Sequence, residues 1–129
     1  MIDFHVDVQT GVAPYAQLVQ QVRQALRLGL LNVGDQLPTV KEVVAKVAIN
    51  PNTVLKAYRE LEHEGLVSPR PGVGTFVTRT LTDDSLPAHE PLRQELQQWL
   101  DKAYRAGLDA ESIEALFMTT FRTAVKVRK

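Results

Sequence analysis

Apolar residues recur with two different periods along the first part of the chain. Residues 2–8 alternate between apolar and polar side chains, a pattern that predicts a short, half-buried strand. Residues 14–29 instead carry apolar side chains at every third or fourth position, which predicts a helix with one buried face. Pro14 suits the first helical position, where a missing N–H costs nothing, and Gly29 suits the end of the helix. The chain is therefore predicted to begin with a strand and an amphipathic helix.

Two more helices are predicted, and the connection between them is short. Thr39 and Glu42 have the spacing of a capping box, in which each side chain accepts a hydrogen bond from the other residue's backbone N–H. Asn50 is a good N-cap and Pro51 a good first residue for the next helix, which Gly65 ends. Only about three residues separate the two helices, a spacing that is typical of a helix-turn-helix.

Two short β-prone runs follow the third helix, at residues 66–68 and 75–78. The residues between them are rich in proline and glycine, so the two runs are predicted to pair as a β-hairpin. The expected turn residues are Pro69, Pro71, Gly72 and Gly74. Three helices followed by a hairpin indicate a winged helix-turn-helix. We therefore predict a mostly α fold with a small β hairpin, and we assign residues 1–79 to this winged domain.

The composition changes after the hairpin. Residues 80–90 are rich in Thr, Asp, Ser and Pro, which predicts a linker. Residues 91–129 then show helical periodicity twice, in a helix that begins near Pro91 and in a second helix that opens at Asp109. Two helices of about 15 residues each cannot bury a core alone, so their apolar faces need a partner surface. That surface belongs either to the winged domain of the same chain or to a second copy.

The overall composition is that of an ordinary globular protein, with 44% hydrophobic and 23% charged residues among 129. No apolar run approaches the ~20 residues that span a bilayer, and the N-terminus lacks the pattern of a signal peptide. The absence of cysteine excludes disulfides, thiolate zinc sites and cysteine catalysis, and it fits the cytoplasmic location that we expect. Because the formal net charge is +0, any affinity for DNA must come from a local surface.

The sequence offers little support for catalysis. The three histidines fall on the predicted strand (His5), an exposed helix face (His63) and the linker (His89), and none has a second metal ligand at helical spacing. No glycine-rich phosphate loop follows a strand. We therefore expect no enzymatic activity, no metal site and no cofactor.

Residues 14–77 resemble the GntR family of bacterial repressors. Four blocks carry the resemblance, in the family's order and spacing: residues 14–18, 34–39, 52–54 with Tyr58 and Leu61, and 64–67 through 72–77. The turn at residues 50–54 and the short two-helix tail resemble the YtrA-type branch of that family. The resemblance implies a homodimeric repressor that binds an inverted-repeat operator and often controls a transporter operon.

The sequence departs from the family pattern at positions that matter for base recognition. Pro51 and Leu55 stand where many members carry arginine, and Lys41 stands where arginine is usual. Arginine-to-guanine contacts are therefore not carried over to Pro51 and Leu55. The base preference, the operator sequence, the regulated genes and the inducing signal stay open.

The third predicted helix is the one expected to read the major groove, with residues near its N-terminus. Asn52, Thr53 and Lys56 are the outward positions there. Asparagine pairs bidentately with adenine, threonine contacts a base or a phosphate, and lysine reaches guanine or phosphate. Asn50 is also a DNA-binding candidate, although helix capping explains it more simply, and Thr53 has an alternative role as a capping-box partner. Because Asn52 has no such local role, we favour a DNA contact for it.

Phosphate contacts are expected from the start of the second helix and from the wing. Thr39 and Lys41 begin the helix that crosses the DNA backbone, where free N–H groups also face phosphates. Arg70 flanks the wing, where it either meets a phosphate or is solvated. Gly72 and Gly74 satisfy the turn geometry, and their flat backbone fits a minor groove. The cations expected on one common face are Lys41, Lys56, Arg59 and Arg70.

The predicted tail, residues 91–129, is assigned to dimerisation, because two DNA half-sites ~10 bp apart favour a two-fold symmetric protein. The residues expected at the dimer interface are Leu96, Trp99, Leu100, Leu116, Phe117 and Phe121. So short a tail has little room for a drug-sized ligand, so any inducer is small or binds between subunits. Two alternatives remain from the sequence: a winged helix that docks on another protein, and a ligand sensor whose tail folds around a metabolite.

Overall fold

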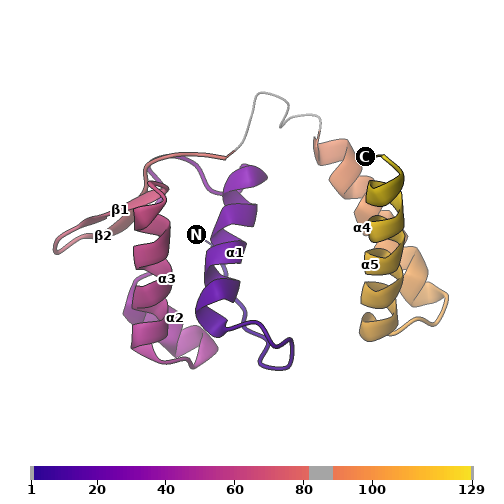
Figure 1. Ribbon diagram of the computed structural model, residues 1–129, viewed down its shortest axis with the longest axis horizontal. Helices are drawn as coiled ribbons and strands as arrows, with labels where there is room; N and C mark the ends of the chain where they lie inside the picture. Colours follow the sequence, from indigo (N-terminus) through magenta and orange to yellow (C-terminus); the bar gives the residue numbers. More distant parts are fainter. Residues whose placement is uncertain (1, 82–88, 129) are drawn as a thin grey trace. The chain divides into compact units, whose positions relative to one another are not determined.

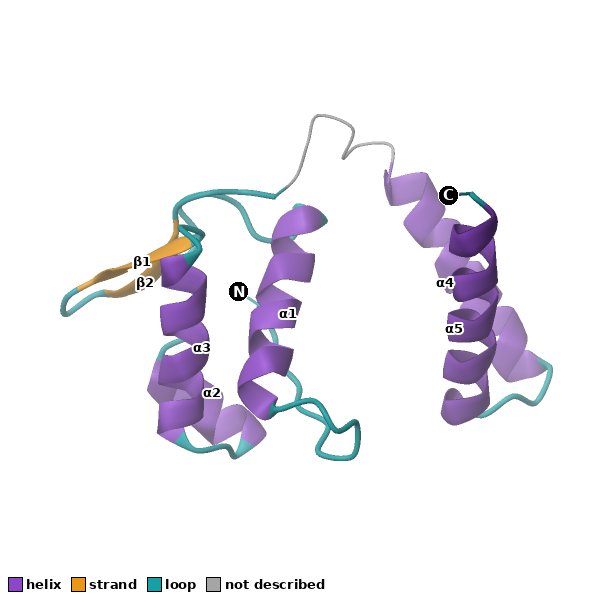
Figure 2. Cartoon of the chain, viewed as in Figure 1, coloured by secondary structure: helices purple, strands orange, loops and turns teal. Residues whose placement is uncertain are grey.

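A computed structural model describes residues 2–81 and 89–128 of the chain, which divides into two compact units, residues 1–86 and 87–129 (Figure 1). The first unit contains, in chain order, α1 (Pro14–Arg27), α2 (Val40–Val47), α3 (Pro51–His63), β1 (Val67–Arg70) and β2 (Gly74–Val77). The second unit contains α4 (His89–Arg105) and α5 (Ala110–Val127). The described residues are mostly helical with one small hairpin (Figure 2), so the predicted fold class is confirmed.

The core of the first unit lies where α1 and α3 pack against each other. Leu18, Val22 and Leu26 of α1 are spaced at four residues and are fully buried. Val54 and Leu61 of α3 face them and are equally buried. Burying one such aliphatic side chain stabilises a fold by roughly 1.5–3 kcal/mol. The periodic stripes seen in the sequence therefore fix which face of each helix is left for solvent.

The predicted helix starts are confirmed by their caps. The Thr39 Oγ1 atom accepts from the Glu42 backbone N–H at 3.1 Å, and the Glu42 carboxylate accepts from the Thr39 N–H at 3.0 Å. Asn50 caps α3 through its Oδ1 atom, which accepts from the Asn52 N–H at 2.8 Å. Between α2 and α3, Ala48 adopts a left-handed conformation with φ of 52°. The two helices thus meet at a tight turn with a defined backbone.

Residues 2–8 do not form a strand, so this prediction is wrong. Residues 2–7 are extended, but two glutamine side chains of α1 take the place of a neighbouring strand. The Gln21 amide accepts from the His5 N–H at 3.1 Å and donates to the His5 carbonyl at 2.7 Å. The Gln17 amide does the same for Asp7, at 2.9 and 2.8 Å. Glutamines one helical turn apart match backbone groups two residues apart on an extended chain.

The alternation within this segment is correct only in part. Phe4 is buried, and Ile2 and Val6 pack against the core, as the pattern predicts. The predicted burial of Val8 is wrong, because its side chain is 83% exposed at the turn that follows. The apolar side chains thus hold this segment on α1, while the glutamines satisfy its backbone.

The hairpin pairs antiparallel, with Val67 opposite Val77 and Arg70 opposite Gly74. Pro69 and Gly74, which were expected in the turn, lie in β1 and β2 instead, so that part of the prediction is wrong. Proline is tolerated on an edge strand because the N–H that it lacks would face solvent. A third extended segment holds the base of the hairpin, through hydrogen bonds between residues 34–37 and the backbone of β2.

The second unit is a pair of helices with few buried residues. Ala103 of α4 and Ile113 of α5 are its buried apolar side chains among the described residues. Asp109 caps α5 as predicted, since its carboxylate accepts from the Ser112 N–H at 2.8 Å. Hydrogen bonds from the side chain and the backbone of Ser112 lower the pKa of Asp109. α4 begins at His89, two residues before the predicted start at Pro91. Most of the predicted linker, residues 80–90, lies outside the described residues.

Candidate nucleic-acid interface

One face of α3 points away from the core and carries polar side chains. Asn52, Lys56, Arg59 and His63 follow one another at spacings of three and four residues, opposite the buried stripe. All four are exposed. Within the part of the chain that the structure describes, the side chains of Asn52 and Arg59 form no hydrogen bond or ion pair. This face therefore offers an amide and cations to an outside partner.

The three polar residues at the start of α3 have different roles. The capping role of Asn50 is confirmed, because its Oδ1 atom binds the Asn52 N–H. Thr53 is half-buried, so it is less outward than expected. Its backbone N–H donates to the Asn50 carbonyl at 2.9 Å, and the capping box proposed as its alternative role is not formed at α3. Asn52 is the member of this group that is exposed and whose side chain forms no hydrogen bond with a described residue.

Lys56 is exposed, but an aromatic ring restricts the position of its side chain. Its Nζ atom lies 3.9 Å from the centroid of the Tyr15 ring, at the first turn of α1. An ammonium over the face of an aromatic ring is attracted by the electron density of that face. Tyr15 thus limits the positions that the lysine can adopt on the outer face of α3.

The start of α2 belongs to the same unit as α3 and packs close to it. Lys41 is exposed and forms no ion pair with any described residue. Thr39 is exposed at the N-cap, and its backbone and side-chain hydrogen bonds lower the pKa of Glu42. Tyr58 fixes this helix start to α3, because its hydroxyl donates to the Pro38 carbonyl at 2.5 Å. Burial raises the pKa of that hydroxyl, so it remains a donor at any physiological pH.

The wing presents a short loop and one stacked cation. Arg70 lies over the ring of Phe76, with 4.2 Å between the guanidinium carbon and the ring centroid. Gly72 has φ of 74°, a left-handed conformation that glycine adopts without steric cost. Gly74 has φ of 147°, and a Cβ atom there would lie 2.4 Å from the Nε2 atom of Gln36. The predicted turn role is therefore confirmed for Gly72, whereas Gly74 lies in β2 and leaves room for the side chain of Gln36.

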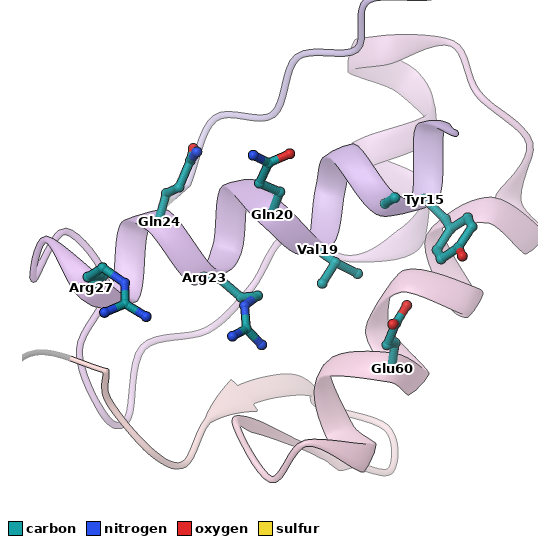
Figure 3. A pocket seen from close by; sticks show the side chains of 8 residues that line it. Tyr15, Val19, Gln20, Arg23, Gln24, Arg27 and Glu60 are labelled. Atoms are coloured by element: carbon teal, nitrogen blue, oxygen red, sulfur yellow. The ribbon is translucent and has the colours of Figure 1, made fainter. Parts of the chain in front are cut away.

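Hollows lie on both sides of α3. A cleft of about 230 Å³ separates α3 from the hairpin, and its walls include Leu55, Arg59 and Thr75. A hollow of about 410 Å³ lies on the opposite side, between α1 and α3, with Arg23 and Glu60 at its edges (Figure 3). The exposed polar face of α3, from Asn52 to His63, thus lies between two hollows, and this shape leaves the face accessible along its length.

Two contributors to this surface were missed by reasoning from the sequence. Tyr15 was assigned only to the buried stripe of α1, and nothing local indicates that its ring lies under a lysine of α3. Gln36 was given no role of its own, although its amide donates to the Val73 carbonyl at 3.2 Å. Arg59 was expected only as one of the cations on a common face, and its spacing from Asn52 is the signal that places it there.

The described residues give no support to other kinds of site. No group of three or more His, Cys, Asp or Glu side chains among them is placed to hold a metal ion. Within the same ranges, no helix combines the length and the apolar character that crossing a membrane requires.

The comparisons with known proteins agree with this geometry. Residues 14–77, from α1 to β2, match the family described as "Bacterial regulatory proteins, gntR family". The chain is also 32% identical to the HTH-type transcriptional repressor YtrA of Bacillus subtilis (strain 168), over 112 residues that cover 84% of each chain. The chain belongs to the gntR family. It is therefore a transcription regulator with a DNA-binding winged helix-turn-helix rather than an enzyme, and the similarity to the YtrA-type branch is confirmed.

Solved structures of similar proteins extend the comparison. A transcriptional regulator from Oenococcus oeni is 30% identical, with a TM-score of 0.52 over 90% of this chain and 97% of the other. AraR(DBD), solved in complex with operator ORE1, is 25% identical, with a TM-score of 0.50 over 57% of this chain and 89% of the other. The gntR-family unit therefore shares its fold with a protein domain that was crystallised on DNA.

Proposed function

We propose that this gntR-family regulator is a homodimeric repressor that binds an inverted-repeat operator, acts in the cytoplasm and controls a transporter operon. Residues 1–79 bind DNA, residues 80–90 link the units, and residues 91–129 dimerise. The main support for this proposal is the exposed outer face of α3, where the side chains of Asn52 and Arg59 form no hydrogen bond or ion pair with a described residue. Residues on it are free to contact DNA, and AraR(DBD), a similar domain, was solved in complex with an operator.

Base recognition is assigned to the first turns of α3. The exposed amide of Asn52 has both a donor and an acceptor, which is what a bidentate contact with adenine requires. Lys56, held by Tyr15, reaches guanine or a phosphate. Thr53 is half-buried and Asn50 is used as a cap, so we assign these two to phosphate contacts at the edge of the groove.

Phosphate contacts are assigned to the start of α2 and to the wing. Lys41 and Thr39 are exposed at the N-terminus of α2, where the helix dipole also attracts anions. Arg70 is exposed beside the wing loop, and Gly72 and Gly74 let the backbone approach a minor groove closely. These local cations compensate for the net charge of +0 of the whole chain.

The dimer is supported by the apolar residues that the tail leaves uncovered. Leu96, Leu116, Phe117 and Phe121 expose 40% or more of their surface, and Trp99 and Leu100 are half-buried. A pair of helices that buries two apolar side chains among its described residues has too small a core to be stable alone. A second copy covers such a face with the same apolar chemistry, and any inducer is small or binds between the copies.

A binding titration with the DNA upstream of the protein's own gene tests this function. We expect nanomolar-range binding, a protected inverted repeat, and affinity that falls steeply as salt rises, because phosphate contacts release counterions. Lys41→Ala should weaken binding to operator and random DNA alike and lower the salt slope by about one. Affinity for the upstream DNA equal to that for random DNA would contradict the proposal and favour a protein-docking role for α3.

A further inference from the structure

The wing depends on a contact from outside the hairpin. A two-stranded hairpin is only marginally stable by itself. Figure 2 shows this hairpin extending away from the helices, and Val73 at its tip is 60% exposed. The backbone of residues 34–37 holds the base of the hairpin, through Leu37 N–H to the Thr75 carbonyl at 2.9 Å and Val77 N–H to the Asp35 carbonyl at 2.8 Å. These bonds do not reach the tip, where Val73 N–H donates to the Arg70 carbonyl at 2.9 Å within the turn itself.

Gln36 extends this support to the tip. Its backbone bridges to Phe76 in β2, and its Nε2 atom donates to the carbonyl of Val73, the turn residue just before β2 begins. The side chain runs so close to Gly74 that a Cβ atom there would lie 2.4 Å from Nε2 and 3.3 Å from Cδ. Glycine at position 74 therefore gives Gln36 the room to reach the tip.

We propose that Gln36 is a positioning residue for DNA recognition: its amide fixes the angle of the wing tip, and with it the place of Arg70 beside the DNA. The proposal rests on the proposed function. Arg70 pairs with Gly74 at the tip end of the two strands and stacks on Phe76, the bridge partner of Gln36. If the wing tip moves, the guanidinium of Arg70 therefore moves with it. Gln36 itself touches no DNA in this scheme.

The test replaces the amide while keeping the length of the side chain. Gln36→Met keeps the packing over Gly74 but cannot donate to the Val73 carbonyl. We expect faster amide hydrogen exchange at residues 72–75 of the free protein. We also expect about a tenfold loss of operator affinity, the scale of one lost charge-assisted contact. The salt slope should fall by about one, because Arg70 no longer holds its phosphate. Gln20→Met, the same change at an exposed glutamine of α1 whose side chain forms no hydrogen bond with a described residue, should alter none of these.

A second variant keeps the test decisive if Gln36→Met folds poorly. Gly74→Ala places a methyl group where the Gln36 amide lies and should displace it, with the same change in salt slope. Unchanged exchange at the tip, or an unchanged salt slope, would overturn the proposal. If exchange rises while operator affinity stays the same, Gln36 is only structural. Wild-type protein that does not prefer operator DNA would instead remove the proposed function and this inference together.

Discussion

At the scale of single residues, Asn52 separates recognition from folding more cleanly than its neighbours. Asn50 caps α3, and Thr53 is half-buried, so changing either one alters the helix as well as the surface. The side chain of Asn52 is exposed and makes no hydrogen bond with a described residue. Its loss should therefore appear in DNA binding and hardly at all in stability.

Asn52→Ala should reduce operator affinity by about ten- to a hundredfold, since a bidentate contact is worth roughly 1–3 kcal/mol of discrimination. The preference at one symmetric base pair per half-site should relax. The melting temperature should hardly change, because alanine is at least as favourable as asparagine in an exposed helical position. Binding titrations on operator and random DNA, together with a thermal melt, measure all three effects. Equal losses on both DNAs would assign Asn52 to a phosphate instead.

Tyr15 should affect DNA binding only through Lys56. Tyr15→Leu removes the ring beneath the ammonium and should weaken operator binding about two- to fivefold, the scale of an exposed cation–π contact. Tyr15→Phe keeps the ring and should bind like the wild type. In a Lys56→Ala background, Tyr15→Leu should have no further effect on the operator titration. A loss that persists in that background would mean that Tyr15 contacts DNA itself.

At the scale of the elements, the turn between α2 and α3 contains a residue in an unfavourable conformation. Ala48 is left-handed and exposed. Ala48→Gly should raise the free energy of unfolding by about 0.5–1 kcal/mol, because relief of the steric cost exceeds the added entropy cost of glycine. Ala45→Gly, inside α2 and also exposed, should lower it by about 1 kcal/mol. Urea denaturation measures both, and a loss in both variants would contradict the left-handed turn.

The start of α2 should make stability depend on pH. Hydrogen bonds from Thr39 hold the pKa of Glu42 below its ordinary value of 4.5. The carboxylate is thus favoured in the folded state, so its contribution is complete above the unfolded pKa and is lost as pH falls through the folded one. Glu42→Gln can still accept the Thr39 N–H but cannot titrate, so the fall in urea midpoint between pH 7 and pH 3 should be smaller than in the wild type. An unchanged fall would exclude Glu42 as a source of the pH dependence.

The helices and their caps could be predicted because their signals are local. Thr39 and Glu42, or Asn50 and Pro51, lie within one turn of each other, and the apolar stripes repeat with the period of the helix itself. The extended N-terminal segment shows the limit of such signals. Its alternation is visible in the sequence, but the partners of its backbone are glutamine side chains of α1, which tertiary packing selects. The stacking of Lys56 on Tyr15 depends on tertiary packing in the same way.

At the scale of the whole molecule, the proposed dimer should depend on the apolar face of the tail. Phe117 and Phe121 stack with 6.1 Å between ring centroids, and Phe121 is 52% exposed. Phe121→Glu should shift the protein towards monomer in sedimentation velocity at micromolar concentration, because two buried carboxylates would face each other across a two-fold axis. Leu30→Glu, at an exposed leucine of the first unit, should leave the assembly intact. A wild-type protein that sediments as a monomer would contradict the dimer itself.

In the proposed dimer, the small core of the second unit would make gene regulation sensitive to the number of copies of the protein. With Ala103 and Ile113 as its buried apolar side chains among the described residues, the helix pair would gain its stability mainly by pairing with a second copy. Ordering of the tail and assembly of the repressor would then be one event, whose extent rises with the square of the subunit concentration. A cell that dilutes the protein by growth would lose operator occupancy faster than it loses protein. Repression would therefore switch over a narrow range of expression levels even without an inducer.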